Sequence, residues 1–251
     1  MSDSSRSRLA NFALGCVLVG LVGGISAVFL TRFGVSDFRL GLVASAAFML
    51  IVAVGVLLGV IGFVRGVLGR PGLASSVIAV VAGAAILFVP LVNAMNGGSV
   101  PMIHDITTDL EDPPTFVAVV ALRGEDANAL DRSTPDLNAL QRTAYPQLQT
   151  LSVADDTTTV FNAVLEEIAA QGWELADAVE PQNGEPGRIE ATDTTLLFGF
   201  KDDIVIRIAD DGPDRTLVDM RSVSRVGESD LGVNAARIEA FLRALDARLQ
   251  G

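Results

Sequence analysis

Three long stretches without a formal charge fill most of the first hundred residues of this chain. They cover residues 9–31, 40–64 and 71–103. The apolar part of each is about 20 residues, enough to cross about 30 Å of hydrocarbon as a helix. No ionisable side chain lies in the middle of a stretch, so the usual mark of an ion or proton path is missing from them. The sequence therefore predicts a membrane anchor of three helices over residues 1–96.

The charge of the chain is divided unevenly between the anchor and the rest. The whole chain is 50% hydrophobic and carries a formal charge of −12. Residues 1–96 contribute +4 (6 Arg, 2 Asp) and residues 97–251 contribute −16 (12 Lys and Arg, 28 Asp and Glu). An acidic segment of about 155 residues is long enough for its own core. Its charge argues against a nucleic-acid partner, because phosphates would repel it.

The arginines beside the predicted spans indicate an orientation. Arginine prefers the cytoplasmic side, and four arginines flank one side of the anchor against two on the other. The sequence thus predicts a multi-pass protein of the plasma (inner) membrane with a cytoplasmic N-terminus and an extracytoplasmic C-terminal domain. Seventeen arginines against one lysine suggest a GC-rich bacterial genome, which would make this a periplasmic domain of the bacterial envelope. The six arginines are Arg6, Arg8, Arg65 and Arg70 on one side, and Arg32 and Arg39 on the other.

The first span leaves two alternatives open. A cleaved signal peptide would also place arginines before an apolar run, but this run is longer than a usual signal core. Cys16, the single cysteine, follows a short sequence similar to a lipoprotein cleavage box, although the apolar run continues past it. We expect an uncleaved helix with a buried thiol.

Glycines recur at a spacing of four within the first two spans. Such spacing lets helix backbones approach closely, either at a dimer face or inside one three-helix bundle. We expect packing within the bundle and leave the oligomeric state open. The pairs are Gly20 and Gly24, Gly55 and Gly59, and Gly62 and Gly66.

The acidic part is predicted to be an α+β domain of two layers, an antiparallel sheet covered by helices. Residues 97–149 are rich in glycine and proline and read as an irregular wrapping arm, with short helical pieces at 115–122 and 137–143. Residues 150–251 form the α+β domain proper. Helical periodicity runs over 156–171 and from about Asp230 onward, where Val233 is placed on the apolar face. Alternation predicts strands at 173–179, 188–194, 196–200, 204–208 and 217–223.

Three strings of the acidic part resemble one family. They span residues 103–116 (IHDITTDLEDPPTF), 198–203 (FGFKDD) and 222–238 (SVSRVGESDLGVNAARI). In this order they are similar to the domain-of-unknown-function 1499 family, over about residues 97–251. The resemblance implies no settled activity and supplies no catalytic residues. It also implies that short apolar spans often precede the domain.

His104, the single histidine, lies among acids that include Asp105 and Asp109. An imidazole with carboxylates could bind a divalent cation or act as an acid or base near neutral pH. The spacing matches no established metal loop, and acids beside prolines commonly form turns. A structural turn is therefore the expected role, and we predict neither a metal nor another cofactor.

Three arginines surround the expected start of the last helix, near Asp230 and Asn234. Guanidinium groups and free amides at a helix N-terminus can together hold a phosphate or carboxylate. Equally, the arginines could pair with Asp105 and Asp109 and fasten the arm to the sheet. The arginines are Arg221, Arg225 and Arg237.

The sequence lacks a strained serine elbow, a phosphate-binding glycine loop and a dinucleotide fingerprint. It therefore favours an extracytoplasmic binding or interaction module of the envelope over an enzyme. The expected partner, besides the lipid bilayer, is an envelope protein or a small anionic ligand. The alternatives are a hydrolase that uses His104 with carboxylates, metal-assisted or not, and a purely structural scaffold.

Overall fold

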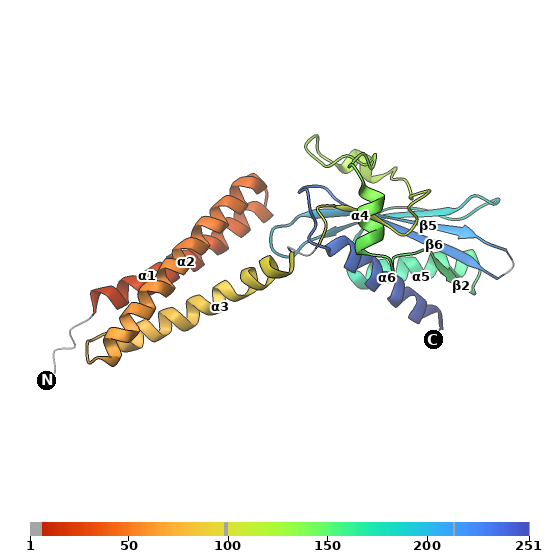
Figure 1. Ribbon diagram of the computed structural model, residues 1–251. Coiled ribbons are helices and arrows are strands. Elements are labelled where there is room, and N and C mark those ends of the chain that lie inside the picture. Colours follow the sequence, from red (N-terminus) through yellow and green to blue (C-terminus); the bar gives the residue numbers. More distant parts are fainter. Residues whose placement is uncertain (1–6, 98–99, 213, 251) are drawn as a thin grey trace. The chain divides into compact units, whose positions relative to one another are not determined.

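The computed structural model describes residues 7–97, 100–212 and 214–250. The chain divides into two compact units (Figure 1). One is formed by residues 1–98 with 196–199, and the other by residues 99–195 with 200–251. The first is helical and the second is an α+β domain, which confirms the predicted fold class.

Three helices of the first unit are long and apolar enough to span a membrane. They are α1 (Arg8–Arg32), α2 (Phe38–Val67) and α3 (Leu73–Gly97). Their best windows have mean hydropathies of 2.4, 2.8 and 2.4, with α3 counted over Leu73–Val92. Ser7 and Asp37 cap α1 and α2 by accepting hydrogen bonds from backbone N–H groups of the first turn. The chain is thus a membrane protein by the length and composition of these helices.

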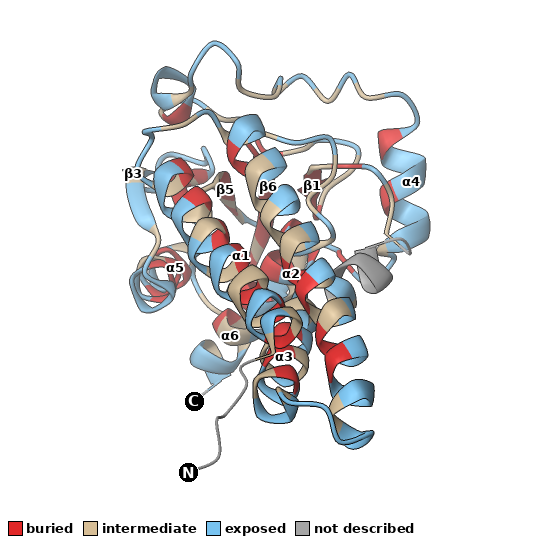
Figure 2. Ribbon diagram, turned by 90° about the vertical axis from the view of Figure 1, so that its left-hand side faces the viewer, coloured by how far each residue is buried: buried red, intermediate tan, exposed pale blue. Residues whose placement is uncertain are grey.

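The spaced glycines lie where α1, α2 and α3 pack on one another. Gly20, Gly24, Gly55, Gly59 and Gly62 are buried inside the unit. A side chain on Gly20 would collide with Val52 and with the Phe48 carbonyl oxygen, and one on Gly55 with Val17. These glycines therefore serve helix packing within one chain. In Figure 2, buried positions alternate with exposed ones along α1 and α2, as expected for helices with apolar outer faces.

The second unit is built on a six-stranded antiparallel sheet. The strands lie in the order β1-β6-β5-β4-β3, and the short β2 also pairs with β6. Both β1 and β2 lie on the same edge of β6, because they pair with its two ends. A β-bulge between Leu175 and Asp177 interrupts the ladder of β3 with β4. The strands are β1 (Asp105–Thr107), β2 (Leu151–Val153), β3 (Glu174–Val179), β4 (Gly187–Thr194), β5 (Lys201–Asp210) and β6 (Thr216–Ser224).

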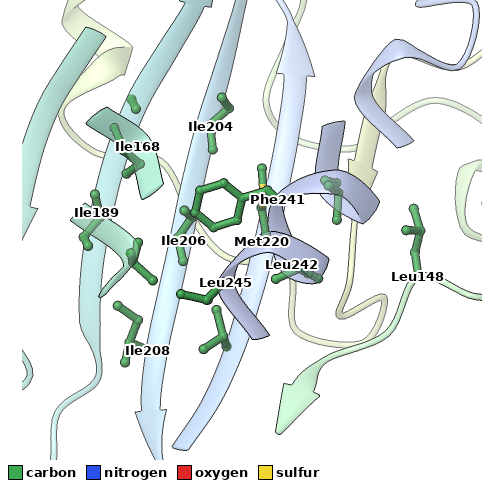
Figure 3. Close-up of a cluster of buried hydrophobic side chains, with 14 of the residues drawn as sticks. Leu148, Ile168, Ile189, Ile204, Ile206, Ile208, Met220, Phe241, Leu242 and Leu245 are labelled. Carbon is green, nitrogen blue, oxygen red and sulfur yellow. The ribbon is translucent and has the colours of Figure 1, made fainter. Parts of the chain in front are cut away.

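Helices α5 (Thr157–Gln171) and α6 (Val233–Gln250) cover one face of the sheet (Figure 1). Alternate residues of the strands, such as Ile206 and Met220, meet the apolar faces of these helices in one buried cluster. Figure 3 shows the ring of Phe241, from α6, above Ile206 of β5. Trp173 stacks on Phe241, with ring centroids 5.2 Å apart. This apolar layer is the core of the domain.

Residues 108–136 and helix α4 (Leu137–Ala144) belong to the arm, which covers the opposite face and one edge of the sheet. A short 3-10 helix, η1 (Val119–Leu122), lies within it. The backbone N–H groups of three arm residues bond to a carboxylate of β4, which fixes this part of the arm to the sheet. The sheet therefore has one face under helices and one under irregular chain.

Three local predictions were wrong. Residues 196–200 form no strand but lie in the connection between β4 and β5, where Gly199 adopts a φ of +71°. An apolar run without polar alternation does not distinguish a strand from an exposed loop. Residues 105–107, assigned to the irregular arm, form β1, because three residues are too few to show a period. Val233, expected on the buried face of the last helix, is 47% exposed at its first turn.

Candidate functional site

The arm-facing side of the sheet carries charged side chains instead of apolar ones. Strand geometry places Asp203 and Arg207 on the opposite side of β5 from Ile204 and Ile206. On β6 the same alternation places Asp219 and Arg221 toward the arm, and Arg225, directly after the strand, continues it. Charged groups are rarely buried unless paired, so their partners decide what this face can do. We call these five residues, with Glu190 of β4 and Asp105 of β1, the charged layer.

Arg221 and Asp105 form a buried pair within this layer. Arg221 donates from Nε to Asp105 Oδ1 (3.0 Å) and from Nη2 to Oδ2 (2.8 Å), and each side chain is only 4% exposed. Arg132 of the arm donates to the same carboxylate at 2.7 Å. Arg221 also bonds to the carbonyl oxygens of Pro114 and Leu130. A β6 residue thus fastens β1 and two points of the arm.

Asp203 holds a second node of the layer. Its side chain is fully buried and pairs with both Arg123 of the arm and Arg225. Arg225 donates from Nη2 to Asp203 Oδ1 at 2.7 Å and from Nη1 to the Leu122 carbonyl oxygen at 2.8 Å. Thr192 of β4 donates to the same carboxylate at 2.9 Å. The two guanidinium groups of Arg123 and Arg225 therefore share the single carboxylate of Asp203, so this node carries more positive than negative charge.

Arg207 is surrounded by three carboxylates at the edge of the layer. It lies 2.8 Å from Asp109, 2.6 Å from Asp112 and 2.9 Å from Asp219. Burial acts to lower the pKa of Arg207, but hydrogen bonds to these carboxylates raise it overall. Burial likewise acts to raise the pKa of Asp109, and it is outweighed by the backbone N–H groups of Asp112 and Glu111 and by Arg207, so this pKa is lowered. Both groups stay charged at neutral pH.

Glu190 anchors the arm through its backbone. Its carboxylate is fully buried and accepts N–H hydrogen bonds from Val117 (2.9 Å), Ala118 (3.1 Å) and Val119 (3.0 Å). Arg188 Nε lies 2.8 Å from Glu190 Oε1, although not in a hydrogen-bonding direction. Three successive backbone N–H groups can bind an anion, and here the anion is the carboxylate of Glu190.

Arg237, Asn234 and Asp230 lie on the other side of the sheet, around the start of α6. Arg237 donates to Asp193 at 2.8 Å and also pairs with Asp202. Asn234 accepts from Ser222 at 2.7 Å and donates to the His104 carbonyl oxygen at 3.0 Å. These bonds join α6 to the ends of the strands.

Asp230 occupies the N-terminal cap of α6. It accepts hydrogen bonds from the N–H groups of Gly232 at 2.8 Å and Asn234 at 3.0 Å. Burial raises the pKa of Asp230, and the N–H bonds only partly oppose this. Two amides at this helix start, of Gly232 and Asn234, are therefore already bonded to a side chain of the chain itself.

His104 lies beside this cap, just before β1. Its Nδ1 is 3.4 Å from the Glu228 carbonyl oxygen, and its own carbonyl oxygen accepts from Ser224 N at 3.0 Å. Its sequence neighbour Asp105 belongs to the charged layer with Arg221. Across residues 7–97, 100–212 and 214–250 no group of three or more His, Cys, Asp and Glu side chains is arranged to hold a metal ion.

The eight predicted site residues therefore fall into two groups. Arg221, Arg225, Asp105 and Asp109 lie on the arm side, whereas Arg237, Asn234, Asp230 and His104 lie at the start of α6. The three arginines do not converge on one point, and each is paired with carboxylates. Residues that the sequence analysis missed complete the arm side: Glu190, Asp203, Arg207, Asp219, Arg123 and Arg132. Glu190, Arg207 and Asp219 alternate with apolar residues in predicted strands, a pattern that is equally typical of a solvent-exposed face, whereas Asp203 borders a predicted strand and Arg123 and Arg132 lie in the arm.

Three hollows open around the arm segment 108–115. The first, of about 280 Å³, lies between 112–115 and the β4 start, with Arg188 and Arg207 in its wall. The second, of about 440 Å³, lies between 108–111 and α4 with Tyr145. The third, of about 490 Å³, lies between Leu110 and residues 131–139. Glu111 and Asp112 on this segment have side chains 86% and 82% exposed. The segment, with the hollows beside it, is the candidate site.

Fold and site together define a membrane protein with an α+β domain whose irregular arm is held by a buried charged layer. The family model described as "Protein of unknown function (DUF1499)" matches residues 105–245. The chain belongs to this family.

Comparison with solved structures gives a more distant similarity. A START superfamily protein from Mycobacterium smegmatis aligns with 18% sequence identity and a TM-score of 0.26. The alignment covers 41% of this chain and 94% of that one. A similarity at this level supports no conclusion about function. No curated protein matches the chain significantly.

Proposed function

We propose that this protein is a membrane-anchored binding module of the bacterial cell envelope, whose domain takes a partner protein at the hollows around residues 108–115. The observation that carries the proposal is the arrangement of this segment. It projects two exposed carboxylates between three hollows, while the layer beneath it is held by buried ion pairs. A fixed loop with open flanks suits recognition of another chain, because little conformational freedom is lost on binding.

The arginine distribution supports an extracytoplasmic domain. Arg65, in the last turn of α2, and Arg70, just after α2, are on the same side as the N-terminus, whereas Arg32 ends α1 and Arg39 begins α2 beside Asp37. The positive-inside tendency then puts the N-terminus in the cytoplasm of a plasma membrane. Three spans leave the C-terminal domain on the other side. Activity of a C-terminal fusion to a reporter that works only in the cytoplasm would refute this orientation.

Charge favours a basic stretch of an envelope protein over a small anion as the partner. The arginines nearest the hollows already bind carboxylates, so an anion would have to displace Asp109 or Asp112 from Arg207. Residues 97–251 carry −16, which raises the local concentration of cations and repels anions. The exposed Glu111 and Asp112 offer acceptors to lysine or arginine side chains.

A hydrolase based on His104 has less support from the geometry. Its neighbouring carboxylate, Asp105, is 3% exposed and is committed to Arg221 and Arg132. A general acid or base has to reach substrate, and this carboxylate is turned away from solvent.

The proposal is tested by photo-crosslinking in intact cells that express the full chain. A photoreactive side chain at Thr115, beside the first hollow, is expected to give an adduct with a discrete envelope protein. The same group at Ala170, exposed on α5 at the other face of the sheet, is the control and is expected to give none. The double variant Glu111→Lys, Asp112→Lys should remove the adduct, since it reverses the charge that attracts the partner.

Two outcomes would contradict the proposal. One is an adduct that survives the charge reversal or forms equally from position 170. The other is that millimolar phosphate or citrate, rather than any protein, raises the urea midpoint of the purified chain in detergent, which would favour a small anionic ligand. Emission of Trp173, the single tryptophan, reports that midpoint for the domain alone.

A further inference from the structure

The connection between β4 and β5 presents apolar side chains to the outside. It is closed at its base by two hydrogen bonds, from Thr195 N to the Phe200 carbonyl oxygen and from Phe200 N to Thr195 Oγ1, both 2.8 Å. Leu196 is 81% exposed and Leu197 is 63% exposed. Among the described residues, no large hydrophobic side chain is more exposed than Leu196. A closed turn that holds leucines in this way is a specific feature, because exposed apolar groups of this size usually mark a contact surface.

The sheet topology fixes which end of the domain carries this turn. β4 ends and β5 begins there, where Thr194 pairs with Lys201. β6 also ends there, since Asp202 pairs with Ser224, and β1 begins there, since Asp105 pairs with Val223. The turn therefore lies at the end of the sheet where the chain enters the domain.

The length of the entering chain keeps this end close to the membrane. Helix α3 ends at Gly97 and β1 begins at Asp105. Eight residues of extended chain reach at most about 29 Å, at about 3.6 Å each. Whichever side of the membrane the domain occupies, the tether keeps its entry end within this distance of the end of α3.

Other residues make the two ends of the sheet chemically different. At the entry end, Met102 is 63% exposed and Leu231, next to the Asp230 that bonds the Ile103 carbonyl oxygen, is 59% exposed. The far end carries the β3–β4 and β5–β6 turns, which contain Glu180, Asn183 and Glu185, and Asp210, Asp211 and Asp214. The most exposed of these apolar side chains thus lie at the entry end, where Glu174 and Glu228 are also exposed, whereas the far-end turns carry mainly acids.

We propose that the turn 195–200, with Met102 and Leu231, inserts into the interfacial layer of the phospholipid bilayer that α1–α3 cross. Lipid is the occupant that the position favours, because the chain tethers this end within reach of the membrane before any partner is considered. Lys201 borders the turn with a side chain that is 43% exposed, and its amine lies 3.7 Å from the exposed Glu174 carboxylate. Such a surface pair is weak, so the amine can turn to lipid phosphate groups while its stem lies along apolar surface. The insertion would orient the domain with the β3–β4 and β5–β6 turns away from the membrane. It does not depend on the proposed function.

The experiment uses the full chain in nanodiscs of phosphatidylcholine and phosphatidylglycerol, where both leaflets face solvent. Cys16 is the single native cysteine, so Cys16→Ser gives a background for one new label. An NBD fluorophore on Leu197→Cys is compared with the same fluorophore on Asn183→Cys at the far end. We expect the label at 197 to emit at shorter wavelength, to be quenched by nitroxide-bearing lipids, and to be reduced by aqueous dithionite several-fold more slowly than the label at 183.

Equal dithionite rates at the two positions, with no quenching by nitroxide lipids, would overturn the proposal. So would protection at position 197 that is lost on dilution to one chain per disc, since that would show a second copy as the occupant. Unchanged Trp173 emission verifies that each labelled chain is folded, and Leu196→Cys provides a second labelling position should Leu197→Cys misfold.

Discussion

Replacing Asp105 by asparagine isolates the contribution of the charged layer to stability. The substitution keeps the shape of the side chain but leaves Arg221, whose side chain is 4% exposed, and Arg132, whose side chain is 11% exposed, without their shared carboxylate. Removing one partner of a buried ion pair costs about 3–5 kcal/mol, because a charge is left buried and uncompensated. We expect a loss of this size in the free energy of unfolding of the domain.

The loss in the free energy of unfolding can be measured by urea unfolding of the full chain in detergent, followed by Trp173 emission. Trp173 stacks on Phe241 in the core, so its emission reports the domain and not the membrane helices. With a denaturant slope of about 2 kcal/mol/M, the expected loss lowers the urea midpoint by about 1.5–2.5 M. Glu111→Gln is the matched control, because the Glu111–Arg142 pair has side chains 86% and 65% exposed. An exposed pair contributes about 0–1 kcal/mol, so the control should move the midpoint by less than about 0.5 M.

Equal midpoints for Asp105→Asn and Glu111→Gln would show that the buried pair contributes no more than an exposed one. The double variant Asp105→Asn, Arg221→Met removes the stranded guanidinium of Arg221, so it should recover part of the loss, because fewer buried charges lack a partner. A midpoint for Asp105→Asn no lower than that of the double variant would contradict a cost from buried, unpaired charge.

Three further predictions follow from single side chains. Tyr145→Phe should leave the urea midpoint unchanged or raise it slightly, since the buried hydroxyl of Tyr145 has no hydrogen-bond partner among the described residues; a clear decrease would show that the hydroxyl is bonded. Asp109→Asn should lower stability at neutral pH but not below the folded-state pKa of Asp109. That pKa is depressed below the ordinary value of 3.8, so the stabilisation by Asp109 is complete above pH 3.8 and is lost as pH falls through the depressed value. A difference in urea midpoint between the variant and the original protein that persisted in stronger acid would contradict this. Gly20→Val should let the helices separate at lower temperature, as measured by maleimide labelling of Cys16, because the new side chain would overlap Val52. Gly15→Val is the control, since its Cβ would meet no heavy atom within 4 Å, and it should not lower that temperature. Equal labelling curves for the two variants would argue against the packing role of Gly20.

The sequence predicts the elements that carry strong local signals. The helix expected over 156–171 is α5, Thr157–Gln171, because Asp156 accepts from two N–H groups at its start and Gly172 adopts a φ of +71° at its end. The membrane helices are predicted equally well, since a run of about 20 apolar residues is seldom anything other than a membrane-spanning helix. β1 could not be found, because its three residues are defined only by pairing with β6.

The charged layer could not be predicted from the sequence, because its pairs join residues far apart in the chain. Pairing of Arg221 with Asp105 is one of the two alternatives that the sequence raises, and the structure contains this pair. Asp109 instead meets Arg207, a residue that reads as the polar face of an amphipathic strand. Alternation reveals which residues share a face, but it does not reveal that irregular chain covers that face.

The bulge in β3 has a consequence for molecules held in a membrane. β3 ends the sheet, and its outer side is the place where a strand of a neighbouring molecule could add. Confinement to a plane brings identical domains together far more often than free solution does. The irregular spacing between Leu175 and Asp177, with acidic side chains at Glu174 and Asp177, spoils the regular template and repels a like-charged copy. Neighbouring molecules at high density in the membrane can therefore diffuse past one another without their β3 edges pairing into aggregates.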